Sequence, residues 1–116
     1  MSPKDGRAMA SARTAHLLGI AANLNMATIS LWGQSPRAAA ILGMFEASIR
    51  WEGPGGSDED LLERLRNLFE EAKKYHARED FPAMMARLRV AYDLVSIRII
   101  EVSGERSEAS NDEVSR

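Results

Sequence analysis

The stretch from Thr14 to Phe45 reads TAHLLGIAANLNMATISLWGQSPRAAAILGMF, and Arg37 is its only charged residue. From Ser57 to the end of the chain, by contrast, 24 of 60 residues are Asp, Glu, Lys or Arg. A helical segment this poor in charge is expected to be shielded from water on more than one side. The uncharged stretch therefore decides which surfaces of the chain are expected to pack against other protein.

The overall composition is that of one ordinary globular domain: 116 residues, 45% hydrophobic, 28% charged, with a net charge of -2. There is no cysteine, which excludes disulfides, thiol catalysis and cysteine-based metal sites and fits a reducing compartment. The polar N-terminus leads into no continuous apolar run, and no window gives about 18 consecutive apolar residues. We therefore predict a soluble, cytoplasmic protein without a signal peptide or membrane span.

The sequence predicts four helices, with bounds near 8–32, 35–51, 57–78 and 80–103. Gly33 ends the first, and Ser35 with Pro36 begins the second as N-cap and first helical residue. The run Gly53–Gly56 separates the two halves. Ser57 is expected to cap the third helix and Asp80 the fourth, which should end before Gly104.

This element order predicts an all-α fold, a four-helix and mostly antiparallel bundle. The single bundle domain is expected to span residues 8–104. Residues 1–7 and 105–116 contain few apolar side chains, so we predict that both are disordered tails. The third helix is an ordinary amphipath, because its leucines and Phe69 form one stripe and its charges occupy the other side.

The first and fourth helices carry more apolar surface than a four-helix bundle needs. Each has a second stripe in addition to the one expected to face the core. These second stripes are formed by Leu18, Ile29 and Trp32 in the first helix and by Val90, Leu94 and Ile97 in the fourth. An apolar stripe left in water promotes association, so we predict that these residues form a protein interface, most simply in a homodimer through the uncharged N-terminal helices. The alternative is that long arginine side chains cover the stripes within a monomer.

His16 is a candidate phosphotransfer residue. The segment Ala15–Leu24, AHLLGIAANL, is similar to the histidine phosphotransfer signature. That family has a lysine near the histidine, followed directly by a glycine; this segment has no lysine, and aligning Gly19 requires a deletion. The competing interpretation is a packed, hydrogen-bonded histidine. The chain has only two histidines and none of the ligand spacings of a metal site, so we predict no metal, no cofactor and no enzyme activity.

Arginines of the fourth helix provide a second alternative. Arg87, Arg89 and Arg98 would form a basic strip for nucleic acid if their charges faced solvent together. Acidic residues alternate with them along the chain, which is typical of a mixed solvated face.

Three short stretches resemble flagellin-specific export chaperones. They are Ser35–Pro36, Met44–Trp51 (MFEASIRW) and Ala91–Val95 (AYDLV). The resemblance implies an all-helical protein that holds the terminus of an unfolded client. Gly53–Gly56 interrupts a helix that is continuous in that family. Together with the apolar stripes, this favours a non-catalytic interaction module: an adaptor, a chaperone-like protein or an assembly subunit.

Overall fold

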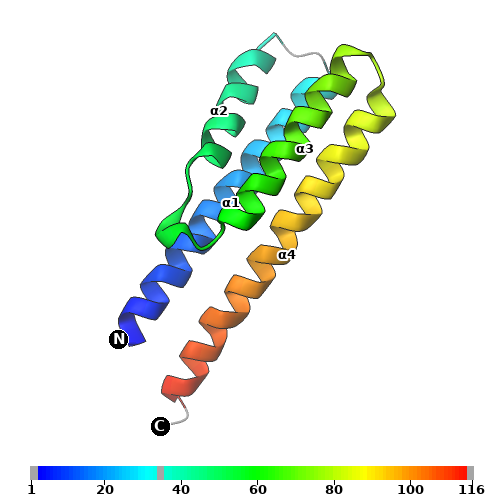
Figure 1. Cartoon of the computed structure of the whole chain (residues 1–116). Coiled ribbons are helices and arrows are strands. Elements are labelled where there is room, and N and C mark those ends of the chain that lie inside the picture. Colours follow the sequence, from blue (N-terminus) through cyan, green and yellow to red (C-terminus); the bar gives the residue numbers. More distant parts are fainter. Residues whose placement is uncertain (1–2, 34–35, 115–116) are drawn as a thin grey trace.

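The computed structural model describes residues 3–33 and 36–114, and the side chains of 8–33 and 36–104. Its elements are α1 (Pro3–Gly33), α2 (Ala38–Arg50), the short 3-10 helix η1 (Pro54–Gly56), α3 (Glu59–Ala77) and α4 (Phe81–Val114). No strand occurs among these residues. Successive α-helices run in opposite directions, so the predicted all-α, antiparallel four-helix bundle is confirmed (Figure 1).

The bundle is arranged so that α1 packs against α2 and α4, and α3 packs against the same two helices. The core consists of one apolar line from each helix. Phe45 of α2 and Phe69 of α3 meet edge to face, with ring centroids 4.9 Å apart. The molecule measures 58 × 22 × 21 Å. The N-terminal end of α1 and the C-terminal end of α4 project beyond the shorter α2 and α3 at the same end of the bundle (Figure 1).

Both terminal helices are longer than predicted. α1 begins at Pro3, and α4 continues through Gly104 to Val114, so the predicted stop before Gly104 is wrong. Nucleating a helix is unfavourable, whereas each residue added to an existing helix brings one further hydrogen bond. One glycine therefore does not end a helix of this length. The division into an 8–104 bundle with tails at 1–7 and 105–116 stays a prediction, and residues 1–2 and 115–116 lie outside the described residues.

Two predicted helix caps need correction. α2 begins at Ala38 after Arg37, which makes no side-chain capping bond, and Ser35 lies outside the described residues. Ser57 does not cap α3, because its backbone closes the turn of η1 and the residue before α3 is Asp58. Asp58 makes no capping bond either. Its carboxylate is held by arginines from other helices, as described below.

The connection between α3 and α4 follows local rules closely. The N–H of Glu79 donates to the carbonyl of His76 (3.0 Å), and the N–H of Asp80 donates to that of Tyr75 (2.9 Å), a Schellman pair. Asp80 then caps α4 through Oδ1, which accepts from the N–H of Ala83 at 3.3 Å, as predicted. Glu79 occupies the left-handed position with φ of 60°, where glycine is the usual residue.

Replacing Glu79 with glycine is expected to stabilise the protein by about 1 kcal/mol, because it removes the strain of a side chain in the left-handed region. Urea unfolding measures the change. Glu79→Ala is the matched control: it removes the same carboxylate but keeps a Cβ, so it should bring no such gain. Equal stability of the glycine and alanine variants would contradict the explanation.

Candidate interaction surface

One side of α1 faces solvent and is apolar along most of its length. We call the line formed by Ala15, Leu18, Ala22, Met26 and Ile29 the outer stripe of α1. At 100° per residue, all five side chains project from the same side of the helix. All five are exposed, Leu18 to 53% and Ile29 to 71% of its surface. The opposite side of the same helix is fully buried in the core through Leu17, Ile20, Leu24, Ala27 and Leu31.

The residues predicted for the interface are placed as follows. On α1, Leu18, Ile29 and Trp32 are all exposed, Trp32 to 63%. On α4, Val90 and Ile97 are exposed. Arginine side chains therefore do not cover these positions within the single chain, because all five side chains are exposed to solvent.

Leu94 differs from the other predicted interface residues, because it is half-buried and packs against the core. It follows Arg87 by seven residues, which places both side chains on nearly the same side of α4. Arg87 reaches Glu71 of α3. Leu94 therefore lies on the α3 side of α4, at the inner edge of the stripe whose exposed members are Val90 and Ile97.

Sequence reasoning missed several exposed apolar side chains beside these stripes. Ile100 of α4 is 70% exposed, and Met44 of α2 and Trp51, which follows α2, are also exposed. The signal for Ile100 was available, because it continues the spacing of three and four residues from Val90 through Ile97. The rings of Trp51 and His16 pack edge to face with centroids 4.6 Å apart, and much of the Trp51 surface faces solvent.

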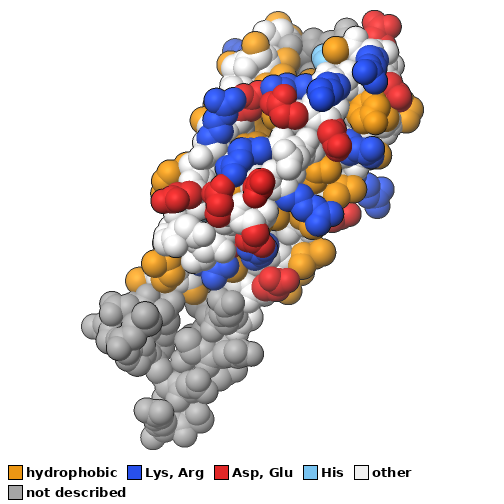
Figure 2. All heavy atoms as spheres, viewed as in Figure 1, with side chains coloured by type: hydrophobic (Ala, Val, Ile, Leu, Met, Phe, Trp, Pro, Cys, Tyr) orange, Lys and Arg blue, Asp and Glu red, His pale blue; other side chains and the backbone are white. Residues whose placement is uncertain are grey.

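The face formed by α3 and its neighbours is highly charged. Figure 2 shows acidic and basic side chains interspersed over this face. Lys73 binds both Glu46 of α2 and Glu70, and the hydrogen bonds that it donates to Glu70 and then to Glu46 raise its pKa. Arg66 pairs with Glu59 and donates to the Ile49 carbonyl at 2.7 Å. The charged face thus pairs its own groups, while the outer stripe of α1 has no charged member.

A cluster of two arginines and three carboxylates ties three helices together. Asp58 is 1% exposed and accepts from Arg13 of α1 (Nη2 to Oδ1, 2.8 Å) and from Arg98 of α4 (Nη1 to Oδ1, 2.9 Å). Arg98 also binds Asp60 through Nη2 at 2.8 Å and lies 3.6 Å from Glu101. The hydrogen bonds that Arg98 donates to Asp60 are the main cause that raises the pKa of Arg98. The start of α3 is therefore fixed to both long helices.

The predicted basic strip on α4 is largely engaged in these contacts. Arg98 belongs to the Asp58 cluster. Arg87 pairs with Glu71 at 3.1 Å and lies over the ring of Tyr75. Arg89 is exposed. The three side chains do not form one row of solvent-facing charges, so the geometry does not favour the nucleic-acid alternative.

His16 is packed at the junction of α1 with the end of α2. Its Nε2 lies 3.4 Å from the Ser48 carbonyl oxygen, and Nδ1 is buried with no hydrogen-bond partner among the described residues. Gly53 lies directly against the ring, because a Cβ built on it would be 2.7 Å from Nδ1. Neither ring nitrogen is presented to an incoming phosphodonor. The geometry favours the interpretation of His16 as a packed side chain.

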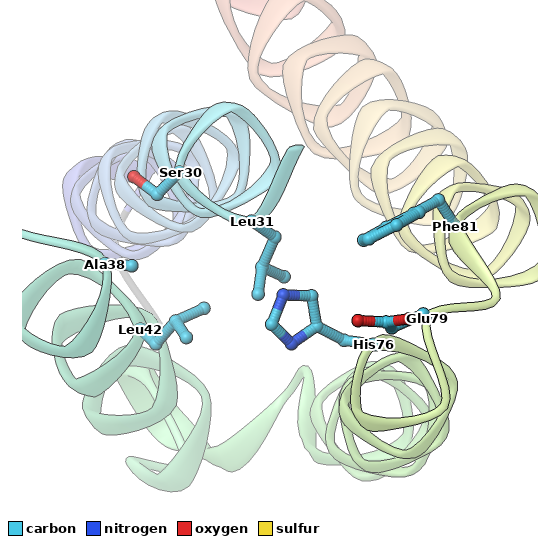
Figure 3. Close-up of a pocket in the computed structure, with 7 residues that line it drawn as sticks. All are labelled: Ser30, Leu31, Ala38, Leu42, His76, Glu79 and Phe81. Atoms are coloured by element: carbon cyan, nitrogen blue, oxygen red, sulfur yellow. The ribbon is translucent and has the colours of Figure 1, made fainter. Parts of the chain in front are cut away.

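A cavity of about 300 Å³ lies at the end of the bundle distant from the termini. The ring of His76 points into it, between Leu31 and Leu42 on one side and Phe81 on the other (Figure 3). Among the described residues that line it, Glu79 is the one Asp, Glu, Lys or Arg. The volume is at the lower limit for small-molecule pockets.

In the part of the chain that the structure describes, no group of three or more His, Asp or Glu residues is placed to hold a metal ion. None of the described helices combines the length and apolar character needed to cross a membrane. Comparison of the chain with protein-family models, with curated proteins and with solved structures finds no match.

Proposed function

We propose that this chain is a non-catalytic protein–protein interaction module that binds through the outer stripe of α1 and the apolar side chains beside it. The observation that carries the proposal is the exposure of Leu18, Ile29 and Trp32 on a helix whose other side is already completely buried. An adaptor, chaperone-like or assembly role in the cytoplasm suits such a surface.

The physical argument concerns the free energy of the exposed side chains. Fully burying a leucine or isoleucine contributes about 1.5–3 kcal/mol, so covering side chains that are half exposed or more contributes about 1–2 kcal/mol each. The centre of a protein interface is also depleted of charge, and the outer stripe has no charged residue. Tryptophan, here Trp32, is the residue most enriched among those that dominate binding energy.

A charge-insertion experiment tests the proposal. Leu18→Glu combined with Ile29→Glu places two carboxylates on the exposed side of α1 and should leave the bundle folded, because neither side chain belongs to the core. Tagged protein expressed in the source cells, next to the untagged chain, is recovered with its partners and compared by quantitative mass spectrometry. We expect each protein recovered with wild type, including any untagged copy of the chain, to be recovered with the double variant in an amount at least about tenfold lower.

The control is Asn67→Glu combined with Lys74→Glu, which places two carboxylates at exposed positions of α3 and lowers the net charge by one more than the α1 variant does. It should retain what wild type retains. Circular dichroism and urea unfolding confirm that both variants are folded. If the α1 double variant and wild type recover the same proteins in the same amounts, the proposed surface is wrong.

A further inference from the structure

We propose that the partner bound by the outer stripe of α1 is a second copy of this chain, whose own α1 lies antiparallel across it with Ala22 on the two-fold axis. This inference rests on the proposed function, because it uses the same surface.

The first argument is the symmetry of the stripe about Ala22. Its members occur at positions 15, 18, 22, 26 and 29, so their spacings read 3, 4, 4 and 3 in either direction. A two-fold axis through Ala22 therefore brings Ala15 opposite Ile29 of the second copy and Leu18 opposite Met26 of the second copy. An isologous interface requires this self-complementarity, in which each contact occurs twice.

The second argument is side-chain size. The outer stripe is small at its N-terminal end and bulky at its C-terminal end, since Ala15 begins it and Ile29 ends it. Antiparallel pairing places the small residue of one copy against the bulky residue of the other, whereas parallel pairing would set alanine against alanine and isoleucine against isoleucine. The two copies of Ala22 meet at the axis, and their small side chains let the two helix backbones approach most closely there.

The third argument is charge and area. The stripe has no charged side chain, so two copies meet without buried unpaired charges. From Ala15 to Ile29 the stripe spans about 21 Å, and the exposed Met44 of α2 adds apolar surface beside it. This surface is smaller than the about 800 Å² per partner of a standard interface, so we expect a reversible dimer.

The oligomeric state of the purified full chain gives the first test. Analytical ultracentrifugation and native mass spectrometry over a micromolar concentration series should show a dimer. Ala22→Glu brings two carboxylates together at the axis and should raise the dissociation constant at least tenfold, whereas Asn67→Glu on the charged face should leave it unchanged. Wild type that stays monomeric throughout the series overturns the inference.

Cysteine cross-linking tests the geometry, and the chain has no cysteine of its own to interfere. Under mild oxidation Ala22→Cys should form a covalent dimer by itself. Ala15→Cys alone should not, since antiparallel pairing separates the two copies of position 15 by about 21 Å along the axis. A mixture of Ala15→Cys and Ile29→Cys proteins should form the mixed disulfide. Efficient dimers of Ala15→Cys alone indicate parallel pairing and overturn the proposed geometry.

The two experiments separate this inference from the proposed function. A monomeric wild type whose recovered partners are lost on Leu18→Glu with Ile29→Glu overturns the second-copy inference and supports the function, with a different protein as the occupant. If the chain is a dimer and neither Ala22→Glu nor Leu18→Glu weakens it, the outer stripe of α1 is not the dimer interface. A dimer lost in Ala22→Glu but kept in Asn67→Glu supports both.

Discussion

Asp58→Ala is expected to lower the free energy of unfolding by about 3 kcal/mol. Asp58 is almost completely buried and accepts hydrogen bonds from Arg13 and Arg98, two side chains that are themselves largely covered. Removing one partner of a buried ionic cluster leaves the remaining charge without compensation, which typically costs 3–5 kcal/mol. The lower end applies here because Arg98 keeps Asp60. Urea unfolding followed by circular dichroism measures the loss.

Asp60→Ala is the matched control for that prediction. Asp60 binds the same arginine, but 72% of its side chain is exposed, so water screens the pair and its loss should cost no more than about 1 kcal/mol. Asp58→Asn should fall between the two, because the amide keeps one acceptor oxygen in place. Equal losses for the alanine variants at positions 58 and 60 would show that burial of Asp58 is not what makes it important.

The same cluster predicts a pH dependence. Burial alone would raise the pKa of Asp58, but the hydrogen bonds from Arg13 and Arg98 outweigh it and hold the pKa below the ordinary 3.8. A carboxyl whose pKa is lower in the folded than in the unfolded state stabilises the fold above its unfolded pKa, and this contribution is lost as the pH falls through the folded value. Wild type should therefore lose more stability below pH 3.8 than Asp58→Ala does.

Gly53→Ala is expected to destabilise the protein by about 3 kcal/mol or more. Gly53 has φ of 79° and ψ of 178°, a backbone conformation open essentially only to glycine, which costs any other residue about 1–3 kcal/mol. In addition, the new methyl group would lie 2.7 Å from Nδ1 of His16, a packed ring atom that must move. Thermal and urea unfolding both report the change.

A double-mutant cycle with His16→Ala separates the two causes. Removing the imidazole opens the space that the methyl group needs, so the double variant should be at least about 1 kcal/mol more stable than the sum of the single effects predicts. The backbone cost at position 53 remains in either background. Strict additivity would mean that contact with His16 contributes nothing, and the loss would then be due to the backbone conformation alone.

Local sequence patterns predicted the four helices and the fold class, because periodicity, proline and glycine act over a few residues. They also predicted that Leu18 and Ile29 form an apolar stripe separate from the core, since a residue's side of a helix follows from its number. The same reasoning predicted the capping role of Asp80. The same patterns could not predict the half-buried position of Leu94, because that position depends on which side of α4 faces α3.

Contacts between distant residues were decided only by the tertiary structure. Asp58 looked like part of an ordinary helix start, yet its carboxylate is used by arginines 45 and 40 residues away in the chain. The role of Gly53 likewise depends on His16, which belongs to another helix. Hydrophobic spacing is a property of one helix, whereas the pairing of buried charges and the fit of a ring against a backbone depend on how the helices are placed together.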